Sequence, residues 1–145
     1  MAPHRIALVS AAFLALAAPA SAEQTVSYQS LMTPLFSGNQ TVLGQTIAYP
    51  EGTPQITSAI VMLPPGGETK WHTHEVPLFA YILEGEITID YGSKGVKVYK
   101  PGDAVLEAID WPHNGTNKGT VPVRLLAVYI GAEGKANAAS AAGGE

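Results

Sequence analysis

Between residues 41 and 130 the chain alternates short apolar runs with clusters of glycine, proline, asparagine and aspartate. Each run is five to ten residues long, a length that is typical of strands rather than helices. The runs occupy residues 41–49, 55–63, 77–83, 86–91, 95–99, 103–108 and 121–130. Many short strands with turn signals between them predict an all-β sandwich or barrel.

The pattern inside these runs also indicates strands. Ile87 and Ile89 alternate with polar residues, and Val96 and Val98 flank Lys97. A period of two is expected when one face of a strand is buried and the other meets water. No stretch beyond the N-terminal segment shows a helical period of 3.6 residues, so we expect almost no helix in this region.

The two flanks of this region have a different character. Residues 23–40 contain the breakers Pro34 and Gly38, so we expect an arm or a lead-in strand there. Residues 131–145 are rich in alanine, glycine, asparagine and serine and have no large apolar side chain. Such a composition predicts a disordered tail.

Residues 1–22 have the features of a secretory signal peptide. Arg5 supplies the positive charge, residues 6–18 form an apolar run rich in alanine and leucine, and the segment from Ala20 to Ala22 is a typical cleavage site. The apolar run is short for a membrane span. We therefore expect cleavage after Ala22 and a periplasmic or secreted bacterial protein.

Charge and composition narrow the classes of function. The formal net charge is −4 and the lysines and arginines are scattered, so no basic cluster is present to bind nucleic acid or an anionic membrane. The chain has no cysteine, which excludes disulfides, thiolate ligands and a cysteine nucleophile. Any chemistry must therefore use histidine, carboxylates, tyrosine or a bound ion.

Three histidines lie beyond the predicted signal peptide: His72, His74 and His113. On a strand, residues two apart project from one face about 6.5–7 Å from each other. Imidazoles at that spacing can converge on one ion at about 2.0–2.2 Å from each ring nitrogen. An isolated pair of this kind is weak support for a metal site. A third ligand from another strand would complete the site, and His113 is the remaining histidine. The pattern predicts a divalent metal site on these three residues.

The sequence around the histidines resembles the two motifs of the cupin family. Residues 66–85 are similar to the first motif, with His72 and His74 at its histidine positions. Residues 102–117 are similar to the second motif, with His113 at its histidine position. The resemblance covers most of the strand-rich region, and it implies a double-stranded β-helix, or jelly-roll, barrel.

The chain departs from the family pattern at one informative position. The usual acidic metal ligand would fall seven residues before Gly85, where this chain has Leu78. The resemblance then implies the three-histidine subset, which includes dioxygenases similar to cysteine dioxygenase and the β-diketone-cleaving enzymes, and these use ferrous iron. We expect iron, with zinc, nickel, copper and manganese as alternatives. Because three neutral imidazoles leave the full double charge on the ion, a small anionic chelating metabolite is the expected ligand.

The sequence leaves three functions open, and it assigns no catalytic residue. They are a metal-dependent dioxygenase, a non-catalytic module that binds a metal or small ligand, and a zinc or nickel isomerase or lyase. Glu75 should point away from the site unless a bulge turns it, and Glu107 is expected to be a strand-surface carboxylate rather than a general base. Analogy with the fold suggests a homodimer paired through residues 25–39.

Overall fold

The computed structural model describes residues 26–143, in a short first unit that ends at Thr33 and a second unit that begins at Pro34. In the first unit, η1 (Tyr28–Leu31) is a single 3-10 turn. The Ser27 side chain caps its start by accepting a hydrogen bond from a main-chain N–H. Residues 26–143 contain no helix long and apolar enough to cross a bilayer.

Two expectations concern the N-terminal region. The predicted signal peptide, with its cleavage after Ala22, falls within residues 1–25 and lies outside the described residues. The arm expected over residues 23–40 is described from residue 26 onward. Between residues 26 and 39 it contains η1 and no strand.

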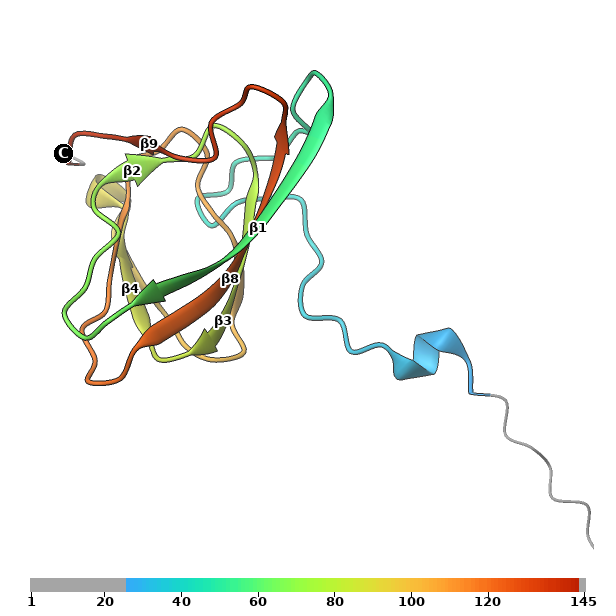
Figure 1. The fold of residues 1–145 in the computed structure, drawn as a ribbon, viewed down its shortest axis with the longest axis horizontal. Coiled ribbons are helices and arrows are strands. Elements are labelled where there is room, and N and C mark those ends of the chain that lie inside the picture. The colour runs from blue at the N-terminus through green and yellow to red at the C-terminus, as the bar shows by residue number, and fades with distance from the viewer. Residues whose placement is uncertain (1–25, 144–145) are drawn as a thin grey trace, which may run out of the picture. The chain divides into compact units, whose positions relative to one another are not determined.

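The second unit begins with residues 34–53, which have one isolated bridge between Gln40 and Thr46, and continues as strands joined by turns and loops (Figure 1). The strands are β1 (Pro54–Leu63), β2 (His72–Thr73), β3 (Leu78–Glu84), β4 (Ile87–Asp90), β5 (Val96–Tyr99), β6 (Ala104–Leu106), β7 (Asn114–Thr116), β8 (Val123–Ala132) and β9 (Ala139–Ser140). Within residues 34–143, the 3-10 turn η2 (Gly92–Lys94) is the one helical element. The predicted all-β class is confirmed.

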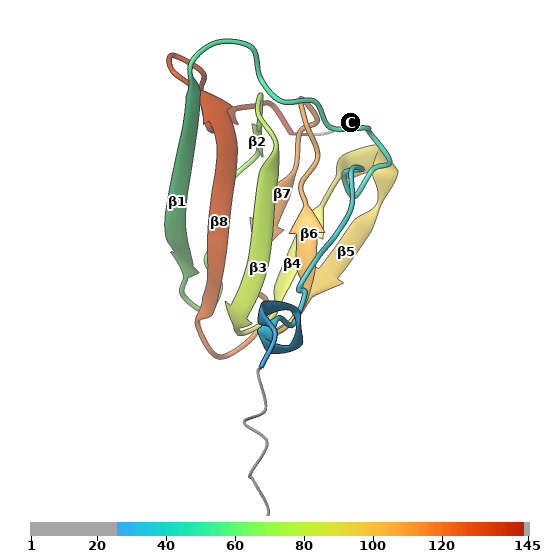
Figure 2. The same ribbon diagram turned by 90° about the vertical axis from the view of Figure 1, so that its right-hand side faces the viewer.

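Two sheets face each other and enclose the core (Figure 2). The first has the strand order β1-β8-β3-β6 and the second has the order β5-β4-β7, with antiparallel pairing in both. A short antiparallel pair, β2-β9, lies beside them. This arrangement agrees with the predicted double-stranded β-helix, or jelly-roll, barrel.

Alternation along the strands builds the core between the sheets. On β3, Leu78, Ala80 and Ile82 are buried, whereas Phe79 and Tyr81 on the opposite face are only partly buried. Inward side chains of β4 and β8 join the same cluster. Burial of each large aliphatic side chain stabilises the fold by about 1.5–3 kcal/mol, which is why the buried face fixes the register of each strand.

Strand β5 has the predicted period of two, but its more apolar face is the exposed one. Ile87 pairs with Tyr99, and residues opposite each other in an antiparallel pair share a face. Because Ile87 is buried, Tyr99 is directed toward the barrel interior. Val96 and Val98 are left 56% and 53% exposed. The register with β4, rather than the hydrophobicity of β5 itself, decides which face is buried.

The prediction of a disordered tail over residues 131–145 is wrong for the part that the structure describes. Strand β8 continues to Ala132, and β9 forms a pair with β2. The pairing uses main-chain groups, which alanine and serine provide as well as larger residues do. Because β9 has no large apolar side chains, the sequence contains no pattern that predicts it.

Candidate metal centre

His72 and His113 lie directly opposite each other on two antiparallel chain segments. The main-chain N–H of each residue donates a hydrogen bond of 3.0 Å to the carbonyl of the other. Residues paired in this way project their side chains from the same face. Two histidines that are far apart in the sequence are thus brought side by side by the main chain.

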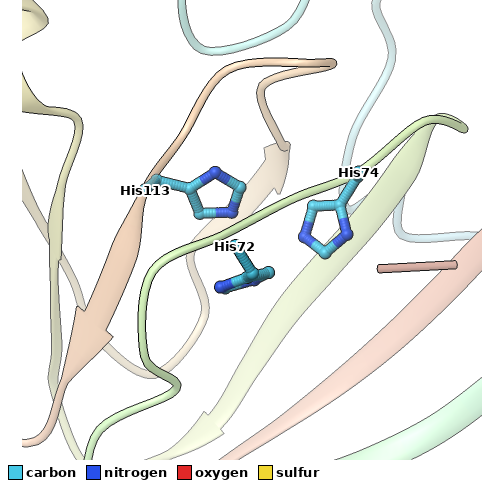
Figure 3. Close-up of side chains that lie close together, drawn as sticks. All are labelled: His72, His74 and His113. Carbon is cyan, nitrogen blue, oxygen red and sulfur yellow. The ribbon is translucent and has the colours of Figure 1, made fainter. Parts of the chain in front are cut away.

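His74 completes a cluster of three imidazoles (Figure 3). Its carbonyl accepts a 2.8 Å hydrogen bond from the Asp110 N–H, which ties the segment after β2 to the segment before His113. The ring centroids are 4.8 Å apart for His72 and His74, 4.4 Å for His72 and His113, and 5.0 Å for His74 and His113. One ring nitrogen of each residue lies within 4.8 Å of those of the other two. The structure brings together all three histidines predicted from the sequence.

The hydrogen bonds of the three rings fix their tautomers. The Nδ1 atom of His72 lies 2.8 Å from the Lys70 carbonyl, that of His74 lies 2.7 Å from the Asn137 carbonyl, and that of His113 lies 2.8 Å from the Trp111 carbonyl. A carbonyl oxygen only accepts, so each Nδ1 must carry the proton. The lone pair of each neutral ring is then on Nε2, as a metal ligand requires.

Burial keeps the three rings neutral. His74 and His113 are each 2% exposed, and His72 is half-buried. Burial lowers the pKa of His74 to about 4, and it lowers the pKa values of His72 and His113 below the usual 6.5. Neutral imidazoles are able to bind a metal across a wider range of pH than exposed histidines are.

Within residues 26–143, no carboxylate belongs to this cluster of three histidines. Glu75 is exposed, and its Oε1 lies 2.8 Å from the Lys135 Nζ, as expected for a side chain that points away from the histidines. Leu78, at the position of the family's acidic ligand, is buried in the hydrophobic core. Imidazole is therefore the sole ligand type in the cluster, and such a donor set fits a transition metal better than magnesium or calcium.

The expectation that Glu107 lies on the strand surface is wrong. Its side chain is only 4% exposed, and its Oε1 accepts a 2.8 Å hydrogen bond from the Ala108 N–H. The alternation that buries Val105 also directs Glu107 inward. Burial raises the pKa of this carboxyl group, and the hydrogen bond from the Ala108 N–H partly opposes that rise. A buried acidic group therefore lies in the interior of the same barrel.

Sequence reasoning missed three further residues beside the cluster. The Tyr91 ring centroid lies 5.7 Å from that of His113, and the Tyr129 ring centroid lies 5.6 Å from that of His74. Asn137, whose carbonyl faces the His74 ring, comes from the C-terminal segment. The two tyrosines belong to no recognisable motif. Asn137 contacts the His74 ring through its main-chain carbonyl, which every residue type has, so the sequence cannot predict this contact.

Residues 59–129, about half of the chain, match the family model of the cupin domain. Together with the double-stranded β-helix fold, this match supports a cupin. The matched region contains the three histidines and ends before the C-terminal segment that contacts His74. No curated protein matches the sequence.

Solved structures share the fold at low sequence identity. An uncharacterized conserved protein with a double-stranded β-helix domain from Klebsiella pneumoniae is 19% identical, with a TM-score of 0.51 over 81% of this chain and 91% of that one. Oxalate decarboxylase from Lactobacillus farciminis, in a formate complex, is 23% identical, with a TM-score of 0.52 over 59% of this chain. A DMSP lyase from Ruegeria pomeroyi is 24% identical, with a TM-score of 0.51 over 59% of this chain. The alignments span 26% of the decarboxylase and 42% of the lyase, so they show the fold alone.

Proposed function

We propose that this protein is a metal-dependent cupin that binds a small anionic metabolite at a divalent transition metal held by His72, His74 and His113. The observation that carries the proposal is the set of three Nδ1 hydrogen bonds to main-chain carbonyls. They orient three neutral rings around one space and leave each Nε2 lone pair free. This is the arrangement that metal-ligating histidines adopt when outer contacts hold them ready for the ion.

The charge of the site supports an anionic ligand. The Nδ1 partners are carbonyls rather than carboxylates, and Leu78 replaces the expected acidic ligand. A divalent ion bound there would keep its double positive charge in a largely buried environment. Three protein ligands also leave coordination positions for the metabolite, so a carboxylate, an enolate or a hydroxy acid is the class of ligand that fits.

The reaction we propose is the oxidation of that metabolite with iron as the metal. Bound ferrous iron would supply redox chemistry with dioxygen and would polarise the oxygen atoms of a chelating ligand. The chain's own part is to hold three imidazoles neutral and oriented while the barrel limits the access of water. Tyr91 and Tyr129, which lie against the ligand rings, restrict where those rings can move.

Replacement of any one of the three histidines by alanine should abolish metal retention. Each change removes one of three protein ligands, so we expect the metal content after dialysis to fall from about one ion per chain to nearly none. The matched control is Glu75→Ala, next to His74 but exposed and paired with Lys135, and it should retain full occupancy. Inductively coupled plasma mass spectrometry of the five proteins measures this. Full occupancy in any histidine variant would refute the three-histidine site.

Acidification should release the metal well below the usual histidine pKa. Bound imidazole must be neutral, and burial has lowered all three pKa values, that of His74 to about 4. Occupancy should therefore persist somewhat below pH 6.5 and be lost as the pH falls toward 4. A metal-binding titration across pH 3.5–8 checks this, and release already complete at pH 6.5 would contradict the buried neutral site.

Oxygen uptake separates oxidation from the two alternatives. Protein loaded with ferrous iron should consume dioxygen in the presence of one of a panel of diketones, thiols and hydroxy acids, and His113→Ala should not. Binding of a panel member without oxygen uptake would favour the non-catalytic module. Conversion of one of these compounds by zinc- or nickel-loaded protein without oxygen uptake would favour an isomerase or lyase.

We also propose that the protein is exported and that its mature chain begins at Glu23. The proposal rests on the charge of Arg5, the apolar run after it and the small residues from Ala20 to Ala22. Mass spectrometry of the protein recovered from the periplasm or medium should give the mass of residues 23–145. A mass that includes residues 1–22 would overturn it.

A further inference from the structure

The C-terminal segment 135–143, called the strap below, lies along the segment that carries two of the three histidines (Figure 1). Strand β9 of the strap pairs with β2, so that Ala139 faces Thr73 and Ser140 faces His72. The next residue, Ala141, donates its main-chain N–H to the Trp71 carbonyl at 3.0 Å. The strap is therefore an additional strand on the histidine-bearing edge.

The strap also supplies the partner of one ligand ring. The Nδ1 atom of His74 lies 2.7 Å from the Asn137 carbonyl. The corresponding partners of His72 and His113 are carbonyls two residues earlier in their own segments, which are present whenever the local chain is folded. Of the three rings, that of His74 alone is oriented by a distant part of the sequence.

The contacts that hold the strap in place are individually weak. Lys135 and Glu75 form an exposed ion pair at its start, and such pairs contribute little to stability. Apart from Lys135 and Asn137, the residues of the strap are alanine, serine and glycine, and most of them are exposed, so they bury little apolar surface. Its order rests on a few main-chain hydrogen bonds, which makes it sensitive to any further contact that favours the ordered state.

We propose that the strap is a positioning element of the metal site, and that binding of the metal and ordering of the strap are coupled. The ordered strap keeps the proton of His74 on Nδ1 and the Nε2 lone pair directed to the metal. The inference rests on the proposed function, since it assumes that the three histidines bind a metal. Because coupling between two events is reciprocal, metal that binds more tightly to the strapped state must also hold the strap more firmly in place.

Removal of the strap should weaken binding of Co²⁺, the metal probe, by about 10–100-fold, the usual effect of losing the outer partner of a ligating histidine. We compare the full chain with a chain that ends at Gly134 by titration against a competing chelator. A chain that ends at Gly143 keeps the strap and should bind as tightly as the full chain. Far-UV circular dichroism on each metal-free protein shows whether the barrel is folded.

A single substitution tests the same point without shortening the chain. Ala139→Pro removes the main-chain N–H of one of the two β9 residues that pair with β2. Ala142→Pro lies beyond the last hydrogen bond of the strap, which the Ala141 N–H donates. We expect the first variant to weaken Co²⁺ binding and the second to leave it unchanged. If the chain that ends at Gly134 does not fold, these two variants decide the matter.

Hydrogen exchange distinguishes coupling from a purely structural role. Saturating Co²⁺ should slow exchange at the Ala141 amide by a factor similar to the loss of affinity caused by removal of the strap. If full-length protein binds no Co²⁺, the proposed function is wrong. If it binds Co²⁺, but the chain that ends at Gly134 or Ala139→Pro is folded and binds equally tightly, the metal site stands and the inference about the strap is overturned. Unchanged exchange at Ala141 would also overturn it.

Discussion

Glu107 places an acidic group inside a barrel whose other inward residues are mostly apolar. It accepts a hydrogen bond from one main-chain donor, the Ala108 N–H, and the nearby Tyr91 side chain also influences its pKa. Tyr91 in turn lies 3.4 Å, oxygen to oxygen, from Tyr99, whose pKa burial raises to about 12. Burial favours the neutral form of all three groups, and it raises the pKa values of Glu107, Tyr91 and Tyr99.

Glu107→Gln should change how stability depends on pH. The folded pKa of Glu107 is raised above 4.5, so between 4.5 and the folded value the folded state holds a proton that the unfolded state has lost. Stability of the metal-free wild type must then fall with rising pH in that window, by about 1.4 kcal/mol per pH unit for one proton. Glutamine keeps the acceptor for the Ala108 N–H and does not ionise, so the variant should gain stability relative to the wild type as the pH rises.

Urea unfolding of both chelator-treated proteins between pH 4 and 9 measures this difference. Parallel stability curves across the whole range would mean that the pKa of Glu107 is not raised. Glu86→Gln serves as the control, since Glu86 is exposed and the change removes the same charge without altering the barrel interior.

At the scale of residues, the sequence predicted the ligands better than their surroundings. His72, His74 and His113 stand out because the motif spacing and the scarcity of histidine both point to them. The burial of Glu107 could not be seen, because a single polar residue at the end of an apolar run is compatible with either face. The Asn137 carbonyl is common to every residue type, so its role depends on tertiary structure alone.

At the scale of elements, the turn from β3 to β4 depends on Gly85. This glycine has a φ of +71°, which L side chains rarely adopt. A Cβ added there would lie 2.5 Å from the Pro122 carbonyl oxygen, where the chain enters β8. The turn is therefore tight both in its own conformation and against the neighbouring strand.

Gly85→Ala should destabilise the protein by about 2–4 kcal/mol, as the sum of about 1 kcal/mol for the left-handed backbone and about 1–3 kcal/mol for the steric clash. Gly102→Ala is the matched control. Gly102 also has a positive φ, +94°, but an added Cβ meets nothing within 4 Å, so only the backbone cost of about 1 kcal/mol applies. Equal losses of unfolding free energy in urea would show that the contact with Pro122 does not matter.

Elements with strong side-chain patterns were predictable, and those built by pairing alone were not. The alternation of β3 and β4 and the glycines in the turns gave the all-β barrel. Strand β2 is two residues long and β9 consists of Ala139 and Ser140, so neither has a pattern that a sequence could show. The buried face of β5 could not be predicted, because a strand's own alternation does not say which face the neighbouring strand will bury.

At the scale of the whole second unit, the outer face of the first sheet is apolar where β1 and β8 lie. Ile56, Ile60 and Met62 on β1 are 61%, 49% and 62% exposed. Their partners on β8 across the ladder include Ile130 and Leu126. Two ten-residue strands give a footprint of roughly 300 Å², which is the size of the largest apolar patch on a typical monomer, and such patches are often functional.

We expect a second copy of the chain to cover this face and form a homodimer. The face carries no unpaired charge, since Arg124 and Glu84 at one end lie 3.5 Å apart within the chain. A face without net charge can pack on itself across a two-fold axis without placing like charges together. β1 is moreover an edge strand, so its outer main-chain groups are available to the same partner.

Ile60→Lys should convert the dimer into a monomer. The change places a lysine at the centre of the face, and the two-fold axis brings two such charges close together in an apolar contact, which costs several kcal/mol. Val98→Lys is the control, because Val98 is similarly exposed but lies on the outer face of the second sheet. Light scattering at micromolar concentration should give a dimer for the wild type and for Val98→Lys, and a monomer for Ile60→Lys. A monomeric wild type would show that the predicted dimer is wrong. A dimeric Ile60→Lys variant would show that the dimer contact lies outside the β1-β8 face, and residues 26–39 would be the next segment to test.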